Sequence, residues 1–250
     1  PIIMDDSELL RYSRHILLDK VGIEGQEKIK SSSVLVIGAG GTASSLILYL
    51  VSSGIGSITI CDNDTVDLTN LQRQILHNTN DISKKKIDSA REKVTKINPH
   101  VNIETLDIYA NSKNLEMIIN KFDYIADCSD NFNTRHEINK LCFINKKKLI
   151  FGSAIKFDGQ VAVFDFTEAS NSCYSCLFPL NSSFEDENCS TMGIFSPVVG
   201  IIGCLQAMEI LKLIISNRSS LTNKILLFNA VSSESKIYEL TKDKKCSVCS

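Results

Sequence analysis

The sequence predicts an α/β fold with a doubly wound sheet that is parallel in its first half and mixed or antiparallel in its second half. A short β-rich run at 34–37 leads into a glycine-rich turn and then a helix-forming run at 45–52. A second β-rich run at 57–61 completes a strand–turn–helix–strand unit. Strands that alternate with helices at this spacing favour a parallel sheet covered on both faces. After Gly159 the helices give way to antiparallel-type strands.

The remaining elements are predicted from periodicity and from the residues that end each run. Ser7 is expected to cap a helix that continues to Leu18. The 82–97 segment carries apolar residues at helical spacing and ends at Asn98-Pro99. The other expected helices cover 25–30, 114–120 and 134–145, and the other expected strands cover 101–106, 122–128, 149–152, 160–166, 225–228 and 235–240.

The composition is that of a folded domain with a substantial core. The chain has 250 residues, of which 43% are hydrophobic and 22% charged, so we expect one large domain or a domain with an appendage. A net charge of −2 argues against a nucleic-acid partner bound through a basic field. The longest apolar stretch, 198–215, is interrupted by glycines and polar residues, and the first residues do not resemble a secretory signal. We therefore expect no membrane partner and a cytoplasmic location.

The glycine-rich turn at 38–43 predicts a nucleotide site in a Rossmann-like sheet. Gly38, Gly40 and Gly41 let the backbone approach a phosphate, and the following helix offers its first N–H groups to the anion. Asp62 and Asp64 end the second strand, where the ligand crevice should lie, and Asp62 suits a ribose hydroxyl. A plain αβ turn in another nucleotide-binding fold, or an acid that only caps the next segment, stays open.

Polar side chains after the second strand point to a triphosphate whose bonds are to be broken. Asn70 and Arg73 follow the acids, and Lys86 ends a run of three lysines. Cations at these places could offset charge on phosphates, although isolated basic residues usually belong to a solvated face. Asp130 ends a later strand and could hold Mg²⁺, which prefers one or two carboxylates together with phosphate oxygens. The alternative is that Asp130 caps the helix that begins after Asn131.

Four cysteines form two CxxC pairs, Cys173 with Cys176 and Cys246 with Cys249. Four thiolates suit a closed tetrahedral Zn²⁺ site, whose role would be structural because no coordination position stays open. Such a site would tie residues 246–249 to the body of the domain. A redox CxxC is the alternative, but that motif usually starts a helix in a βαβ unit.

Cys189 stands apart in the polar segment 178–190, which we expect to form a mobile loop. An exposed, unpaired cysteine can act as a nucleophile if its pKa is lowered. The acidic residues that precede it would raise that pKa instead. An ordinary exposed thiol is therefore an equal alternative.

Taken together, these motifs resemble the ThiF/MoeB/HesA family of E1-like sulfur-carrier-protein adenylyltransferases. The resemblance covers nearly the whole chain and depends on the order and spacing of its motifs. These are RYSRHILL at 11–18, GAGG at 38–41, DNDTVDLTNLQRQ at 62–74, Lys86, NPH at 98–100, DCSDN at 127–131, the CxxC pairs and PVVGIIGCLQAMEILKLI at 197–214. Several of these segments are more similar to the thiamine branch than to the molybdopterin branch.

The resemblance implies a function, a set of site residues and partners. The expected reaction is ATP-dependent adenylation of the C-terminal Gly-Gly carboxylate of a ubiquitin-like sulfur-carrier protein for thiamine thiazole biosynthesis, or alternatively of the molybdopterin synthase small subunit. One adenylyltransferase domain, 1–250, would have a nucleotide-binding half at 1–152 and a half at 153–250 that binds the carrier and zinc. The nucleotide-binding positions that match are Gly41, Asp62, Asn70, Arg73, Lys86, Asp130 and Asn131.

Further implications concern the partners. Arg14, which by itself looks like a surface residue, matches an arginine that reaches the phosphates across a homodimer interface. Cys189 matches a loop cysteine proposed to form an acyl-disulfide with the carrier, and a sulfur donor completes the partners. An NAD-dependent oxidoreductase and a carrier-binding protein without catalysis are the competing interpretations. The cations Arg73 and Lys86 argue against both.

Overall fold

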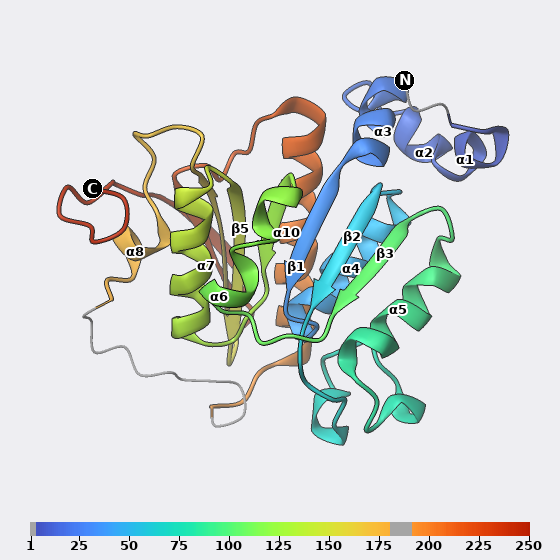
Figure 1. Ribbon diagram of the computed structural model, residues 1–250, viewed down its shortest axis with the longest axis horizontal. Coiled ribbons are helices and arrows are strands. Elements are labelled where there is room, and N and C mark those ends of the chain that lie inside the picture. Colours follow the sequence, from blue (N-terminus) through green and yellow to red (C-terminus); the bar gives the residue numbers. More distant parts are fainter. Residues whose placement is uncertain (1–3, 181–191) are drawn as a thin grey trace.

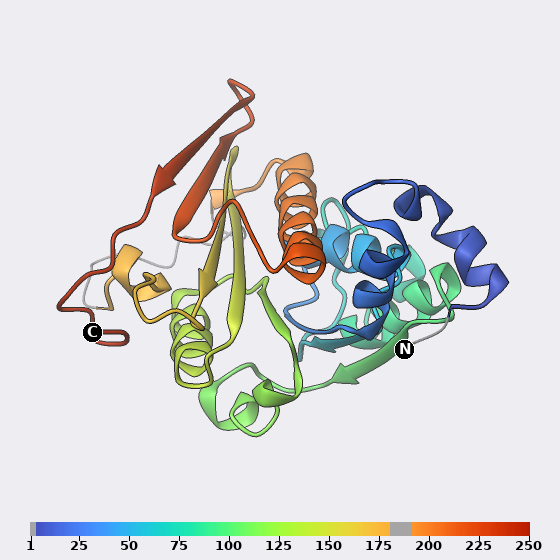
Figure 2. The ribbon, with the colours of Figure 1, turned by 90° about the horizontal axis from the view of Figure 1, so that it is seen from above.

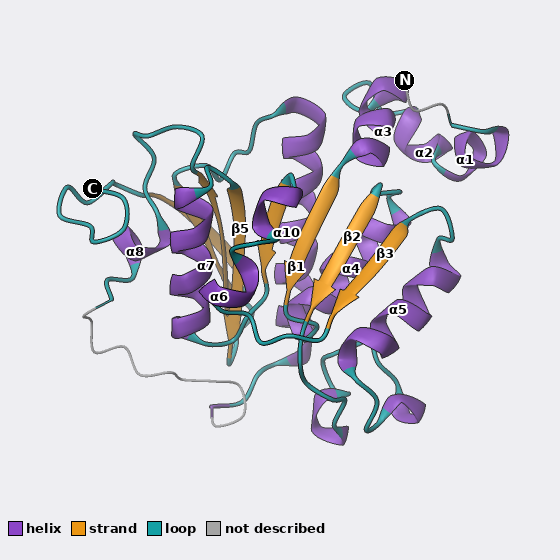
Figure 3. Cartoon of the chain, in the orientation of Figure 1, coloured by secondary structure: helices purple, strands orange, loops and turns teal. Residues whose placement is uncertain are grey.

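The computed structural model describes residues 4–180 and 192–250, and these form one eight-stranded sheet (Figures 1 and 3). Its strand order is β3-β2-β1-β4-β5-β6-β7-β8. The strands β1 to β5 are parallel to one another, whereas β6, β7 and β8 each pair antiparallel to the strand before them. Their bounds are β1 Ser33–Ile37, β2 Ser57–Cys61, β3 Asn102–Leu106, β4 Tyr124–Asp127, β5 Lys148–Ile155, β6 Asp158–Asp165, β7 Lys224–Asn229 and β8 Glu234–Glu239. The predicted fold class is confirmed.

Helices cover both faces of the sheet, as the apolar strands require. On one face lie α3 (Gly22–Ser31), α4 (Gly41–Ser52), α5 (Lys86–Ile97) and α10 (Ser196–Ser216), and on the other lie α6 (Ser112–Leu115) and α7 (Phe132–Ile144) (Figure 2). Within β1, Val34 and Val36 join the core under the first group, while Leu35 and Ile37 join the core under the second. This alternation follows from the two-residue period of a strand, so one run of aliphatic residues serves both cores.

Helix α10 is a buried helix that packs against α4 and the strands β5 and β6. By length and composition alone it could cross a membrane, with a hydropathy of 2.0 over its most apolar window. Its buried residues, however, belong to the same core as those of α4. A side chain on Gly203 of α10 would lie 2.0 Å from the carbonyl oxygen of Thr42 on α4, so only glycine fits there. This contact is what a core helix of a globular domain makes.

Several predicted boundaries were wrong because tertiary contacts divide the segments. The single helix predicted at 7–18 is two helices, α1 (Asp6–Arg11), which Asp5 caps instead of Ser7, and α2 (Ser13–Ile16). The break falls at Tyr12, which is buried against Gly54 and whose hydroxyl accepts a hydrogen bond from Asn98. The remaining short elements are η1 (Leu68–Asn70), η2 (Thr79–Asp81), η3 (Ile119–Lys121) and α8 (Tyr174–Leu177). Most of the loop predicted at 178–190 lies outside the described residues.

Candidate active site

A cavity of about 690 Å³ opens at the carboxyl ends of β1, β2, β4 and β5. This is the edge at which an open parallel sheet binds its ligands, and the volume suits a nucleotide-sized molecule. Predicted site residues from three separate strand ends meet in its wall. They are Gly38, Gly40, Gly41, Asp62, Asp64, Arg73, Lys86, Asp130 and Asn131.

The glycine turn that joins β1 to α4 forms the floor of this cavity. Gly38 has φ +96°, and a side chain there would lie 2.7 Å from the carbonyl oxygen of Cys128 on the neighbouring strand end. Both the positive φ and the lack of room for a side chain therefore require glycine at this position. The Asp62 carboxylate accepts hydrogen bonds from the backbone N–H groups of Ala39 at 2.7 Å and Asp64 at 2.8 Å. Asp62 thus fixes the turn as well as facing the cavity.

Two cations stand near the acids on this side of the cavity. The Lys86 ammonium, on a residue only 7% exposed, forms an ion pair of 2.9 Å with the carboxylate of Asp64. The half-buried Arg73 donates a hydrogen bond of 3.0 Å to the carbonyl oxygen of Thr69. A buried lysine whose partner is largely exposed can exchange that partner for a phosphate at low cost.

His77 is hydrogen-bonded to the glycine turn, and the sequence analysis did not predict this residue as part of the site. Its Nε2 donates to the carbonyl oxygen of Ala39 at 2.9 Å, so Nδ1 accepts from the Ser89 hydroxyl at 2.8 Å. Burial lowers the pKa of His77, which favours this neutral tautomer. The imidazole therefore links the floor of the cavity to α5, the helix that begins with Lys86.

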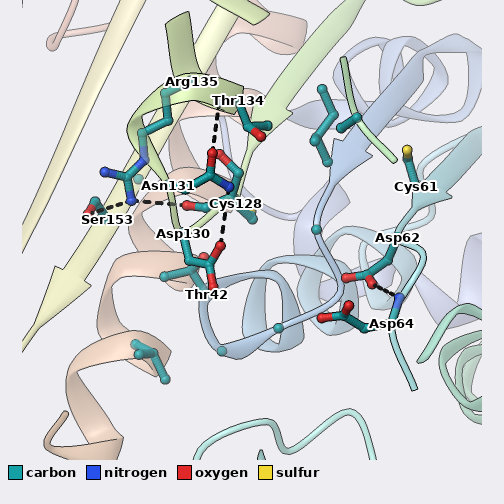
Figure 4. A pocket seen from close by; sticks show the side chains of 18 of the residues that line it. Thr42, Cys61, Asp62, Asp64, Cys128, Asp130, Asn131, Thr134, Arg135 and Ser153 are labelled. Atoms are coloured by element: carbon teal, nitrogen blue, oxygen red, sulfur yellow. Dashed lines mark hydrogen bonds between the residues drawn. The ribbon is translucent and has the colours of Figure 1, made fainter. Parts of the chain in front are cut away.

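The opposite wall is built from the end of β4, the start of α7 and the end of β5 (Figure 4). Asn131, not Asp130, caps α7, because its side-chain oxygen accepts the N–H of Thr134 at 2.9 Å. This leaves the exposed Asp130 carboxylate with one long contact of 3.5 Å, from Asn131, among the described residues. Figure 4 also places Arg135 and Ser153 on this side, facing Asp62 and Asp64 across the cavity.

The structure does not bring every predicted residue to the cavity. Asn70 is absent from its wall. Its side-chain oxygen instead accepts the N–H of Asp67, the residue that caps η1, and so completes a capping box. Arg14 is exposed on α2, at the end of the sheet opposite the carboxyl ends of β1 and β2 (Figure 1). The predicted nucleophile Cys189 lies outside the described residues.

Gln74 and Arg135 are wall residues that sequence reasoning missed. Both are at least nine-tenths buried, and Gln74 Oε1 and Arg135 Nε find no hydrogen-bond partner within the described chain. Buried polar atoms are normally paired, so these two groups fit a cavity built for a polar ligand. A signal for Arg135 existed, because it shares the helical stripe of Ile138, Asn139 and Cys142, all of which are buried.

The four predicted metal ligands come together at the far side of α7. The sulfurs of Cys173, Cys176, Cys246 and Cys249 all lie within 4.8 Å of one another. Neighbouring pairs are separated by 3.4 to 3.9 Å, close to the edge of about 3.8 Å that Zn–S bonds of 2.3 Å give in a tetrahedron. Backbone N–H groups of Cys173, Asp243 and Val248 point at these sulfurs, as expected for thiolates. The cluster could therefore bind a metal ion.

The cysteine cluster is attached to α7, whose first turn forms part of the cavity wall. Between Cys173 and Cys176, the N–H of Tyr174 donates to the side-chain oxygen of Asn139 at 2.9 Å. The Ser175 hydroxyl bonds to His136 at 3.0 Å and to Asn139 at 3.2 Å. Helix α7 thus lies between the nucleotide-sized cavity and the cluster.

Comparison with known proteins gives close relatives along the whole chain. The chain is 39% identical over 246 residues to the sulfur carrier protein ThiS adenylyltransferase of Escherichia coli, covering 98% of this chain and 97% of the relative. It is 37% identical over 249 residues to the molybdopterin-synthase adenylyltransferase of the same organism, covering 98% of each. Its identity to the adenylyltransferase and sulfurtransferase MOCS3 of Aedes aegypti is 39%, but the chain spans only 56% of that protein's length.

Solved structures support the same fold. A crystal structure of Escherichia coli MccB with ATP matches with a TM-score of 0.83 and 24% identity, and the match covers 96% of this chain and 74% of MccB. A selenomethionine structure of PaaA matches with a TM-score of 0.79 and 21% identity, covering 97% of this chain and 76% of PaaA. The model of the ThiF family matches residues 12–248, nearly the whole chain. Together with the relatives, this match confirms the resemblance inferred from the motifs: the chain belongs to the ThiF family.

Proposed function

We propose that this protein is an ATP-dependent adenylyltransferase that activates the C-terminal Gly-Gly carboxylate of a small ubiquitin-like sulfur-carrier protein. The observation that carries the proposal is the convergence of Asp62, Arg73, Lys86 and Asp130 on one cavity above a glycine turn. Relatives that span the full chain and are named adenylyltransferases support it. The same cations argue against an NAD-dependent oxidoreductase, which has no phosphate bond to break.

The reaction proposed is attack of a carrier carboxylate oxygen on the α-phosphorus of ATP. The bond from the α-phosphorus to the bridging oxygen breaks, pyrophosphate leaves, and an acyl-adenylate remains. Asp62 would hold the ribose, and Lys86 and Arg73 would offset the charge that builds on the phosphates. In this step the protein supplies position and charge rather than a covalent intermediate.

Asp130 is the proposed Mg²⁺ ligand. Its exposed carboxylate, which Asn131 releases from any capping role, fits an ion that takes one or two protein oxygens together with phosphate oxygens. The ion would neutralise phosphate charge. An Asp130→Ala variant should therefore bind ATP–Mg²⁺ at least about tenfold more weakly and exchange pyrophosphate far more slowly, while its melting temperature stays unchanged because the carboxylate is exposed. Exchange at the wild-type rate would remove Asp130 from the metal role.

The thiamine branch is the proposed pathway, and a molybdopterin-type carrier is the alternative. A relative named for ThiS supports the first, and a relative named for molybdopterin synthase supports the second at nearly the same identity. The carrier, a sulfur donor that converts the adenylate to a thiocarboxylate, a homodimer and a cytoplasmic location complete the proposal. The role of Cys189 within it is the acyl-disulfide that the family resemblance implies.

The test is ATP–pyrophosphate exchange with the purified protein, run in parallel with a thiamine-type and a molybdopterin-type carrier that both end in Gly-Gly. We expect exchange to depend on a carrier and to be faster with the thiamine type. Carriers that lack the final glycine serve as controls, because the carboxylate then stops short of the α-phosphate. Exchange with neither carrier, despite bound ATP, would refute the proposed function.

A further inference from the structure

Arg135 is a buried cation without a carboxylate partner among the described residues. It is 9% exposed, and its guanidinium lies over the rings of Phe151 at 5.5 Å and Phe132 at 5.7 Å. Its Nη2 donates to the carbonyl oxygen of Ser129 at 3.0 Å and to the Ser153 hydroxyl at 3.1 Å. Its Nε is shielded from solvent and has no hydrogen-bond partner among the described residues. The side chain is thus held in one orientation, and its bonds from Nη2 to Ser129 and Ser153 leave Nη1 as a further donor.

No carboxylate forms an ion pair with this guanidinium among the described residues. Asp127, the carboxyl group that feels it most directly, is itself 1% exposed, and burial raises its pKa. The N–H and hydroxyl of Ser129 both donate to Asp127 Oδ1, at 2.9 and 2.6 Å. An arginine buried without an ion pair is costly, so its site is built for an anion that arrives from outside the chain.

The position of Arg135 in the cavity indicates which part of the substrates supplies the anion that it binds. Figure 4 shows Arg135 across the cavity from Asp62 and Asp64. Lys86, which is proposed to act on the phosphates, pairs with Asp64 and so belongs to that other side. Beside it, Ser153, Ala154, Ile155 and Gln160 also line a second groove of about 430 Å³, which runs over β6 and β7. Both hollows share these four residues, so the groove adjoins the cavity on the side of Arg135.

We propose that Arg135 binds the terminal carboxylate of the incoming peptide tail, which reaches the cavity through the groove over β6 and β7. The proposal rests on the proposed function and adds the residue that recognises the acyl substrate. The guanidinium can donate a charge-assisted hydrogen bond from Nη1 to the carboxylate, and Ser129, Ser153 and the two rings fix its plane. Arg135 would hold the carboxylate for attack, while Lys86 and Arg73 act on the phosphates.

The test compares two forms of one thiamine-type carrier, with a C-terminal carboxylate or a C-terminal carboxamide. Binding is measured in the presence of a nonhydrolysable ATP analogue, and binding of the analogue is measured separately. We expect the wild type to bind the carboxylate form about 10- to 100-fold more tightly, the range for a hydrogen-bonded charge.

Arg135→Gln should bind both forms equally, with nucleotide affinity unchanged. Arg135→Lys keeps the charge but loses the guanidinium plane that Ser129 and Ser153 fix, and it should discriminate less than the wild type. Arg91→Gln, an exposed arginine on α5, is the matched control.

Each outcome separates this inference from the proposed function. Equal binding of both carrier forms by the wild type, or full discrimination by Arg135→Gln, would overturn the inference even where exchange is normal. A loss of nucleotide affinity in Arg135→Gln with discrimination retained would assign the arginine to a phosphate of ATP instead. If Arg135→Gln fails to fold, the Arg135→Lys and wild-type comparisons decide. Failure of the wild type to exchange with any carrier would defeat the proposed function itself.

Discussion

Replacement of Lys86 by methionine should lower the rate of ATP–pyrophosphate exchange by about 10²- to 10³-fold, as expected when one preorganised charge is removed from a transition state. Lys86 is the buried cation at the start of α5, and Asp64 holds its ammonium 2.9 Å away in the cavity wall. Methionine keeps the volume of the side chain. The partner carboxylate is 64% exposed and can be solvated after the change, so the loss of stability should stay below about 1 kcal/mol.

Lys85 is the matched control for this experiment. It is the neighbouring residue, but its exposed ammonium pairs with Asp107 and it does not line the cavity. Lys85→Met should exchange at close to the wild-type rate. Equal losses in both variants would mean that general surface charge, not a phosphate contact, explains the effect.

The same variant tests the proposed position of Arg14 across a dimer interface. If Arg14 of one subunit serves the cavity of the other, an Arg14→Ala protein mixed with Lys86→Met should regain activity. Randomly mixed dimers contain one intact site in each hybrid, which gives about a quarter of the wild-type rate. No recovery on mixing, with subunit exchange verified, would place Arg14 outside the site.

The parts of the site that could be predicted from the sequence are those fixed by strand ends. In a parallel sheet all carboxyl ends meet at one edge, so Gly38, Asp62 and Asp130 could be brought together without coordinates. The two CxxC pairs were predictable for a different reason, since four thiols at this spacing indicate a set of metal ligands. In both cases a local pattern determines the geometry.

The remaining features depend on contacts between segments that the local sequence does not encode. The helix predicted at 82–97 begins only at Lys86, because Ser83 adopts φ +72° and Lys85 is extended. Asn70 was expected at the nucleotide, but its side-chain amide instead bonds to the backbone of Asp67, the cap of η1, and this local bond competes for the same amide. His77 and Arg135 were missed because their partners, Ala39 and Ser153, lie on other elements. One signal in the sequence could have predicted that Arg135 is buried: this cation lies on the same helical face as mostly apolar residues.

The second large effect expected is a loss of stability when the cysteine cluster is opened. Cys246→Ser should cost roughly 3 kcal/mol or more, comparable to the loss of a native disulfide. For a domain of this size that lowers the melting temperature by about 10 °C. The physical reason is that Cys246 and Cys249 are 3% and 2% exposed and hold the segment after β8 against α8 and, through Ser175 and Tyr174, against α7.

Thermal unfolding of the wild type with and without a strong chelator, beside Cys246→Ser and Cys204→Ser, measures this effect. We propose Zn²⁺ as the ion, so elemental analysis should find about one zinc per chain in the wild type and less in Cys246→Ser. Cys204 is a half-buried thiol on α10, outside the cluster, and its serine variant should keep both zinc and melting temperature.

Because α7 also carries Arg135, the chelated protein should bind the carrier carboxylate more weakly even below its melting temperature. A wild-type protein that contains no metal, and melts at the same temperature with chelator, would instead favour a redox role for the two CxxC pairs.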